Sequence, residues 1–254
     1  MSTSIGGKIV TDGLMLHLDA LNPASYPGSG TDWFSLRPNI DYTIDLANGT
    51  NPATIANGYA TFDPANESKA YIGAVVLNRF TPNVTIDFWA KIKPFVGSSI
   101  RRILSIGVNN GFYIGYLDNL AIGIGTNSTN LWGVSGLTVQ SLGAYNAWAH
   151  FSCVLSNGVT SPGYPNLPKE SQKVYINGNL PTQSDQTGDD NGYGNQRSWG
   201  STDSVFFFVG GPLLSSALIW GDFEIASVKA YNRELTQDEV TQNFNAHKGR
   251  FNIY

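Results

Sequence analysis

The sequence has a single cysteine, Cys153, among 254 residues, which excludes an intrachain disulfide and a cysteine metal cluster. Charged residues are also scarce, at 13% of the chain against roughly 25% in an average soluble domain. The net charge is -4, and no basic run occurs. A nucleic-acid-binding protein needs a basic surface, so we expect no nucleic-acid partner.

Long apolar runs are missing as well. No stretch approaches the roughly 20 apolar residues that a membrane-spanning helix needs. Residues 1–13 lack the charged and apolar regions of a signal peptide. We therefore expect a soluble chain with no membrane partner.

Period-two alternation of apolar and polar residues is abundant. Residues 84–92 (VTIDFWAKI) are the clearest case, residues 149–155 (AHFSCVL) repeat the pattern, and Asn177 with Gly178 marks a two-residue hairpin. The alternation predicts that Cys153 is an inert, buried strand residue. Many such short strands, separated by turn residues, predict an all-β fold, an antiparallel two-sheet jelly-roll sandwich.

A helix is predicted near the C-terminus. Thr236 is followed three residues later by Glu239, which is a capping box, and Leu235 and Val240 occupy the positions of a hydrophobic staple. Gly249 is a natural C-terminal stop. A helix this short needs a surface to pack on, so we expect it to cover the outside or the edge of the sandwich.

The domain organisation is simple, because the alternation continues on both sides of every loop. Residues 13–254 are expected to form one jelly-roll domain. Residues 1–12 precede it as an N-terminal arm that is free to dock on another protein, since extended arms gain affinity by adding a strand to an exposed sheet edge.

Several motifs, taken in order, resemble a known family. Residues 225–253 contain a Tyr-Asn-Arg-x-Leu-Thr stretch before the helix, and residues 9–36 contain a Gly-Leu-x-Leu-x-Leu-Asp-Ala strand before an Asn-Pro-x-Ser-Tyr-Pro-Gly-Ser-Gly loop and a Trp. These segments are similar to the ends of LamG-like jelly-roll domains of the concanavalin A-like lectin/glucanase superfamily, of the kind found in bacteriophage virion structural proteins. The resemblance implies two curved antiparallel sheets.

The resemblance also implies a function. The main hypothesis is a phage virion structural or accessory protein, a head decoration, tail or fibre component, assembled in the host cytoplasm and displayed on the external surface of the virion. Its partners would be other capsid or tail proteins, contacted through the arm or the sheet edges, and a homo-oligomer is left open. The alternative is a lectin-like carbohydrate-binding module that recognises host-surface glycans and aids adhesion. A polysaccharide hydrolase is the least favoured hypothesis.

Residues for glycoside hydrolysis are hard to find. The reaction normally needs two carboxyl groups that face each other across the bond, and the Glu-x-Asp-x-x-Glu strand of the superfamily's glucanases has no match here. Residues 222–230 offer only Asp222 and Glu224, and Asp87 stands alone in its strand. No nucleophile motif accompanies the three histidines, which are His17, His150 and His247. We therefore expect no catalytic residue and no enzyme.

Aromatic side chains beside polar loops are the candidates for a sugar site, because sugar pockets combine aromatic faces with fixed polar groups. The glycan-binding candidates are Trp132, Tyr193, Trp199 and Asn191. For the two tryptophans, packing in the core or against their own loops is the favoured alternative. Trp89 and Trp148 lie in strand patterns and are expected to pack.

A calcium ion is the one cofactor considered. Calcium takes six to eight oxygen ligands, several of them from carboxylates, and the polar segment of residues 180–204 is the place that supplies them. The candidate ligands at this rim are Asp185, Asp189 and Asp190. A solvated turn is the favoured alternative for all three.

Overall fold

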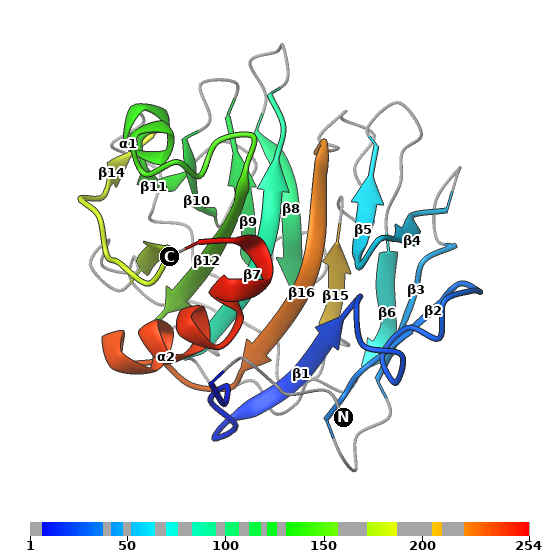
Figure 1. Ribbon diagram of the computed structural model, residues 1–254. Coiled ribbons are helices and arrows are strands. Elements are labelled where there is room, and N and C mark those ends of the chain that lie inside the picture. Colours follow the sequence, from blue (N-terminus) through cyan, green and yellow to red (C-terminus); the bar gives the residue numbers. More distant parts are fainter. Residues whose placement is uncertain are drawn as a thin grey trace.

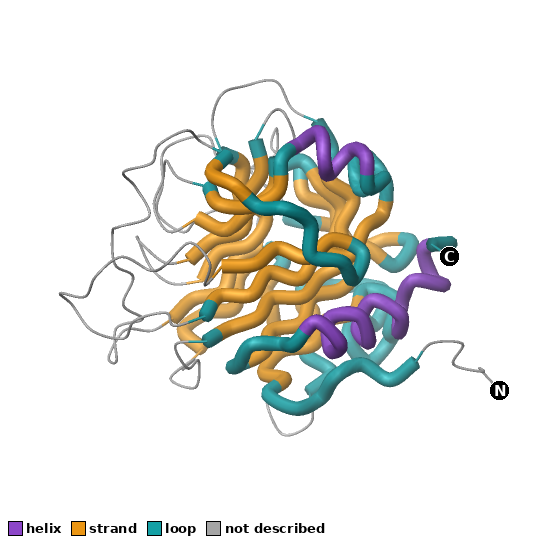
Figure 2. Tube along the Cα trace, turned by 90° about the vertical axis from the view of Figure 1, so that its left-hand side faces the viewer, coloured by secondary structure: helices purple, strands orange, loops and turns teal. Residues whose placement is uncertain are grey.

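The fold is a two-layer β-sandwich (Figures 1 and 2). All strand pairs in the described part of the chain are antiparallel. The predicted all-β antiparallel sandwich with a C-terminal helix is therefore confirmed. The computed structural model describes residues 7–37, 42–47, 52–63, 70–75, 83–94, 100–106, 112–117, 121–125, 131–156, 172–186, 205–209 and 221–253.

The first sheet has seven described strands. The two central ones, β7 and β16, have nine residues each and form its widest platform. A seventh strand, β1 (Leu14–Asp19), pairs with the C-terminal half of β16. The order of the others is β13 (Gln172–Ile176), β12 (Trp148–Leu155), β7 (Val84–Ile92), β16 (Phe223–Tyr231), β5 (Tyr59–Phe62) and β4 (Thr54–Ala56).

The second sheet has nine described strands and closes the sandwich from behind in the view of Figure 1. Several of them are two or three residues long, which fits the many turn residues of the sequence. Their order is β14 (Ser184–Asp185), β11 (Trp132–Val134), β10 (Ile122–Gly125), β9 (Phe112–Tyr116), β8 (Arg101–Ile106), β15 (Val205–Val209), β6 (Ala70–Val75), β3 (Thr43–Asp45) and β2 (Asp32–Phe34).

The core lies between the sheets and is built by the period-two alternation. Phe88 of β7 stacks on Phe151 of β12 with ring centroids 5.4 Å apart, and both are fully buried. Cys153, two residues further along β12, is a buried free thiol whose pKa is raised by desolvation. Its predicted place in the core is confirmed, and its lack of thiolate character makes it inert.

Helix α2 (Gln237–His247) packs on the outer face of the first sheet, as Figure 2 shows from the side. The predicted capping box is present: the Thr236 hydroxyl accepts from the Glu239 amide, and the Glu239 carboxylate accepts from the Thr236 amide at 2.9 Å. Arg233 adds two hydrogen bonds to the same carboxylate at 2.6 and 2.8 Å. None of the described helices is long and apolar enough to cross a membrane.

Helix α2 ends at His247 with Lys248 as its C-cap, so the α-helix stops directly before Gly249, where the sequence predicts its end. After His247 the chain continues as a 3-10 helix, η3 (Lys248–Phe251), and turns at Asn252, whose φ of 56° is left-handed. Asn tolerates this conformation because its short polar side chain can bond locally. The extra turn carries Phe251 onto the Trp89 ring of β7, with centroids 4.3 Å apart and an interplanar angle of 17°.

The described part of the predicted arm lies on the domain. Val10 is 6% exposed, and its amide donates to the Asn243 side-chain oxygen of α2 at 2.9 Å. Gln242 donates to the Lys8 carbonyl at 2.9 Å. Residues 7–12 are therefore seated beside α2, while residues 1–6 lie outside the described residues. The boundary of the domain stays a prediction.

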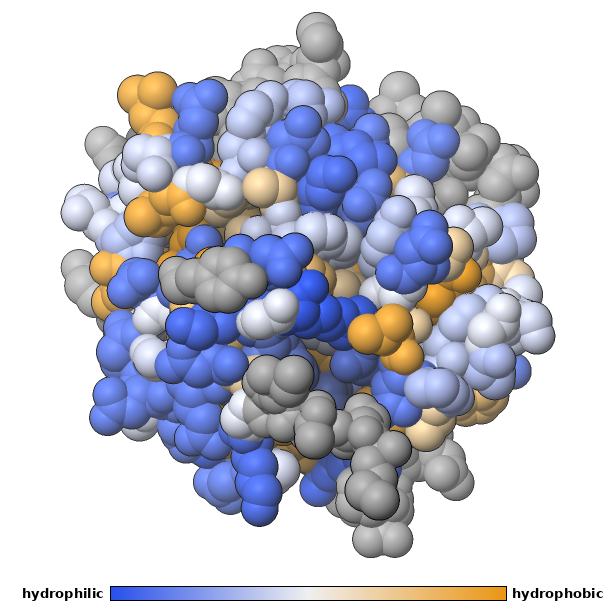
Figure 3. Space-filling view, in the orientation of Figure 1, coloured by the Kyte–Doolittle hydropathy of each residue, from blue (hydrophilic) through white to orange (hydrophobic). Residues whose placement is uncertain are grey.

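The face toward the viewer in Figure 3 is mostly hydrophilic, with an apolar area over α1 (Gly136–Ser141). Leu137 of α1 is 81% exposed and Leu142, directly after it, is 37% exposed. The segment that follows, up to β12, crosses the end of the first sheet (Figure 1). It brings polar and aromatic residues to one place.

Candidate functional site

The structure describes little of the rim at which the sequence predicts binding. Tyr193, Trp199, Asn191, Asp189 and Asp190 all lie outside the described residues. Among the residues that are described, no group of three or more His, Cys, Asp or Glu side chains could hold a metal ion. The rim glycan site and the calcium site therefore stay predictions.

Trp132 is described and lies on β11, between β10 and the two-residue edge strand β14. It pairs with Ile124 of β10, and since directly paired residues share a face, its ring points to the same side as that buried core residue. The side chain is half-buried. The backbone of Asp185 in β14 pairs with Trp132 on its other side.

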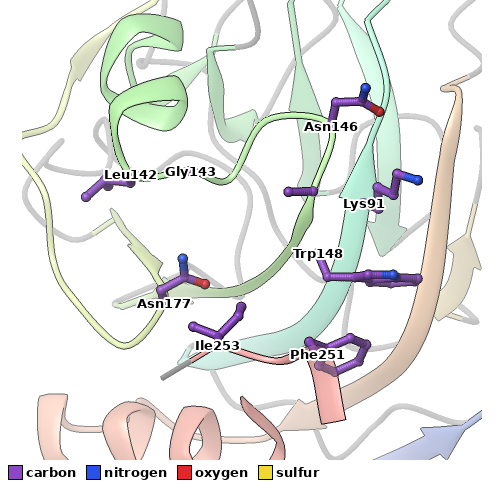
Figure 4. A pocket seen from close by; sticks show the side chains of 9 residues that line it. Lys91, Leu142, Gly143, Asn146, Trp148, Asn177, Phe251 and Ile253 are labelled. Carbon is purple, nitrogen blue, oxygen red and sulfur yellow. The ribbon is translucent and has the colours of Figure 1, made fainter. Parts of the chain in front are cut away.

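A different site is found on the outer face of the first sheet. A cavity of about 430 Å³ opens between the end of β7, the segment after α1 and the C-terminal residues (Figure 4). Such a volume lies within the roughly 300–1,000 Å³ of small-ligand pockets. Its lining comes from four stretches of the chain, and the residues are Lys91, Leu142, Gly143, Asn146, Ala147, Trp148, Asn177, Phe251 and Ile253.

Aromatic rings form one wall of this cavity. Trp148, the first residue of β12, has its ring centroid 5.0 Å from Phe251 and 5.5 Å from Tyr59. Phe251 in turn stacks on the fully buried Trp89. The partly exposed Trp148 ring is thereby fixed in orientation. The strand pattern assigned Trp148 to packing, and the structure adds that it also lines the cavity.

Two asparagines form the polar side. Asn146 and Asn177 have φ values of 47° and 50°, which Asn adopts more readily than most residues. The Asn177 side-chain oxygen accepts from the His150 amide at 3.0 Å. Because that oxygen must be the acceptor, the side-chain nitrogen of Asn177 is left as the donor on its other side. The backbone amide of Asn146 donates to the Ile92 carbonyl at 3.2 Å.

One charged side chain reaches the cavity. Lys91 is the registered partner of Trp148 on β12 and of Glu224 on β16, so the three stand in a row across the sheet. Its ammonium is 3.8 Å from the Glu224 carboxylate. Lys93 lies closer to the same carboxylate, at 3.5 Å, and is 3.1 Å from Asp222.

A buried polar cluster lies further along the same face, beneath α2. Asp87 of β7 receives the Lys229 ammonium at 2.9 Å, His150 Nε2 lies 2.8 Å from its second oxygen, and the Asn243 amide donates to that oxygen at 3.2 Å. All four side chains are fully buried. Desolvation raises the pKa of Asp87, but His150 and Lys229 outweigh it and hold that pKa well below its usual range. Asp87 thus anchors the helix and is closed to solvent.

The other two histidines flank this cluster. Desolvation and the Lys229 charge lower the pKa of His17 to about 4 and that of His247 to about 3. Both rings are therefore neutral at pH 7. Among the described residues, neither ring makes a hydrogen bond to a nucleophilic side chain. We therefore assign both rings a packing role on this face.

No protein-family profile and no curated protein match the sequence. Solved structures do share the fold. Trypanosoma rangeli sialidase in complex with sialic acid aligns with a TM-score of 0.59 and 16% identity, over 96% of this chain and 36% of that chain. The binding domain of botulinum neurotoxin DC in complex with SialylT aligns with a TM-score of 0.58 and 14% identity, over 92% of this chain and 51% of that chain.

These likenesses show the fold, which the concanavalin-like prediction fits, and nothing in them points to a phage protein. The chain spans about a third of the sialidase chains and about half of the toxin chains. The prediction that this chain is not an enzyme is contradicted, because solved structures that share its fold over more than nine-tenths of its length are sialidases. Others are binding domains, so the fold serves both kinds of protein.

Proposed function

We propose that this chain is a carbohydrate-binding module and that the cavity beside Trp148 holds a sugar ring. A pyranose has apolar C–H faces and a rim of hydroxyl groups. It needs a flat aromatic surface and donors or acceptors set around it, which is the composition of small-ligand pockets in general. The Trp148 cavity offers both within about 430 Å³.

The single observation that carries the proposal is that the fixed Trp148 side chain lines the same cavity as Asn146 and Asn177 (Figure 4). The indole is held by Tyr59 and Phe251, and Asn177 is held by its two hydrogen bonds to the His150 backbone, at 2.8 and 3.0 Å. Groups that are ordered before binding lose less conformational entropy when a ligand arrives.

The solved structures supply separate support. A sialidase of this fold was captured with sialic acid and a toxin binding domain with SialylT. At 16% and 14% identity these likenesses carry no residue assignments, but they make glycans the first class of ligand to test.

The test is a glycan array, followed by titration calorimetry with the best ligand. Trp148→Ala should weaken binding at least tenfold, because the ring supplies the flat wall, and Trp148→Phe should retain much of it. Trp132→Ala is the matched control at the predicted rim. The proposal fails if no glycan binds, or if binding survives Trp148→Ala and is lost in Trp132→Ala.

The virion role implied by the terminal motifs is compatible with glycan binding and stays a separate prediction, as do its virion partners and external location. Mass spectrometry or imaging of an intact particle would test it. Repeating the array with and without calcium would test the predicted ligands Asp185, Asp189 and Asp190 in the same experiment.

A further inference from the structure

We propose that the ligand of the Trp148 cavity is an acidic sugar, a pyranose whose carboxylate is bound by Lys91. This inference rests on the proposed function and names its substrate class. It comes from the hydrogen-bonding character of the described groups around the cavity, among which donors outnumber acceptors.

The described lining is rich in donors. Lys91 is the charged residue among them, and none of these described lining residues carries a carboxylate. Asn177 has already committed its side-chain oxygen to the His150 amide, so it presents its nitrogen. Trp148 can add only an indole N–H. A ligand with strong acceptors matches these groups, and a carboxylate is the strongest acceptor that sugars carry.

The geometry of the neighbouring ion pairs leaves Lys91 available. Glu224 is shared by two lysines, and Lys93 is the nearer one, at 3.5 Å against 3.8 Å for Lys91. Lys93 is also held by Asp222 at 3.1 Å. Among the described residues, Lys91 has a single long ion-pair contact, and its side chain is 31% exposed, so its ammonium can turn toward a ligand at little cost.

The position of Lys91 also suits a sugar lying against the aromatic wall. Strand register sets Lys91 directly beside Trp148, and Figure 4 shows both side chains on the same side of the sheet. A ring packed on the indole would thus place a substituent at its edge within reach of the ammonium. The opposite corner of the described lining is formed by the apolar side chains of Leu142 and Ile253.

The experiment compares two matched pairs of probes, methyl glucuronide with methyl glucoside and sialyllactose with lactose, by ligand-observed NMR and calorimetry. In each pair only one member carries a carboxylate. We expect at least one acidic probe to bind tenfold more tightly than its neutral partner, with a preference that shrinks as salt is raised.

Three variants locate the charge. Lys91→Met should abolish the preference, so that the acidic and the neutral member of each pair bind equally. Lys93→Met removes a second positive charge that pairs with Glu224 but does not line the cavity. This variant should keep the preference for the acidic probe. Glu224→Gln frees Lys91 and should strengthen acidic binding.

Equal binding of both members of each pair, with loss in Trp148→Ala, would overturn the acidic-sugar inference and leave the proposed function standing. Loss of the preference in Lys93→Met but not in Lys91→Met would overturn it as well. If none of the four probes binds, the inference is wrong, and the array decides the proposed function separately.

Discussion

Replacing Asp87 by Asn should strongly destabilise the protein. The two side chains have nearly the same volume, so no cavity forms and the effect reports on charge and hydrogen bonding. Lys229, fully buried, would lose its counter-ion at 2.9 Å. The Asn243 amide now donates to Asp87 at 3.2 Å. In the variant it would face the N–H donors of the new amide, with no acceptor for its own hydrogen. Breaking a buried pair in this way costs about 3–5 kcal/mol.

The assay is urea unfolding followed by tryptophan fluorescence, since Trp89 lies beside the cluster. Lys91→Met is the matched control, because the half-exposed Lys91 pair with Glu224 at 3.8 Å should contribute less than about 1 kcal/mol. The double variant Asp87→Asn with Lys229→Met removes the stranded charge and should recover most of the loss.

A cost below about 1 kcal/mol for Asp87→Asn would refute this reasoning, since it would mean that Lys229 is either hydrated or uncharged in the folded protein. The same result would remove the physical account of why α2 stays on the sheet. A double variant as unstable as the single one would show that hydrogen bonding to Asn243, and not charge, carries the effect.

Two further predictions concern the same face. His17 and His247 have pKa values lowered from 6.5 to about 4 and about 3. As the pH drops below about 6.5, the unfolded chain therefore binds protons before the folded chain does, and the free energy of unfolding falls. For His17 the loss reaches up to roughly 3 kcal/mol as the pH approaches 4. Urea midpoints at pH 7 and 4.5 check this, and replacing both histidines by Gln should flatten the difference. Thr236→Ala removes the cap of α2 and should cost about 1 kcal/mol, whereas an unchanged midpoint would show that the Arg233–Glu239 pair suffices.

Local chemistry made much of the fold predictable. The Thr236 capping box depends on side chains three residues apart, and the Asn177 hairpin on two adjacent residues, so both are visible in the sequence and both are present. The alternation in β7 correctly places Phe88 in the core. Gly249 marks the end of the α-helix, but the 3-10 turn that follows has no local signal, because it accompanies the packing of Phe251 on Trp89.

The candidate site could not be predicted in the same way. Asp87 and Lys229 alternate outward and look solvent-exposed in their strands, yet α2, a helix far along the chain, buries them. The Trp148 cavity joins residues from four stretches, and no spacing within any one of them reveals that they meet. The nearest local feature is Asn146, a residue type that tolerates a left-handed turn, two positions before Trp148 at the start of β12.

One wall of the cavity is formed by residues that follow helix α2. Phe251 and Ile253 contribute to it. The sheet beneath is formed by other strands, which pair with one another although they lie far apart in the sequence. Removal of residues 251–254 should therefore leave a folded sandwich with an opened, weakened pocket. Preparations should be weighed intact by mass spectrometry before any negative result with sugars is accepted.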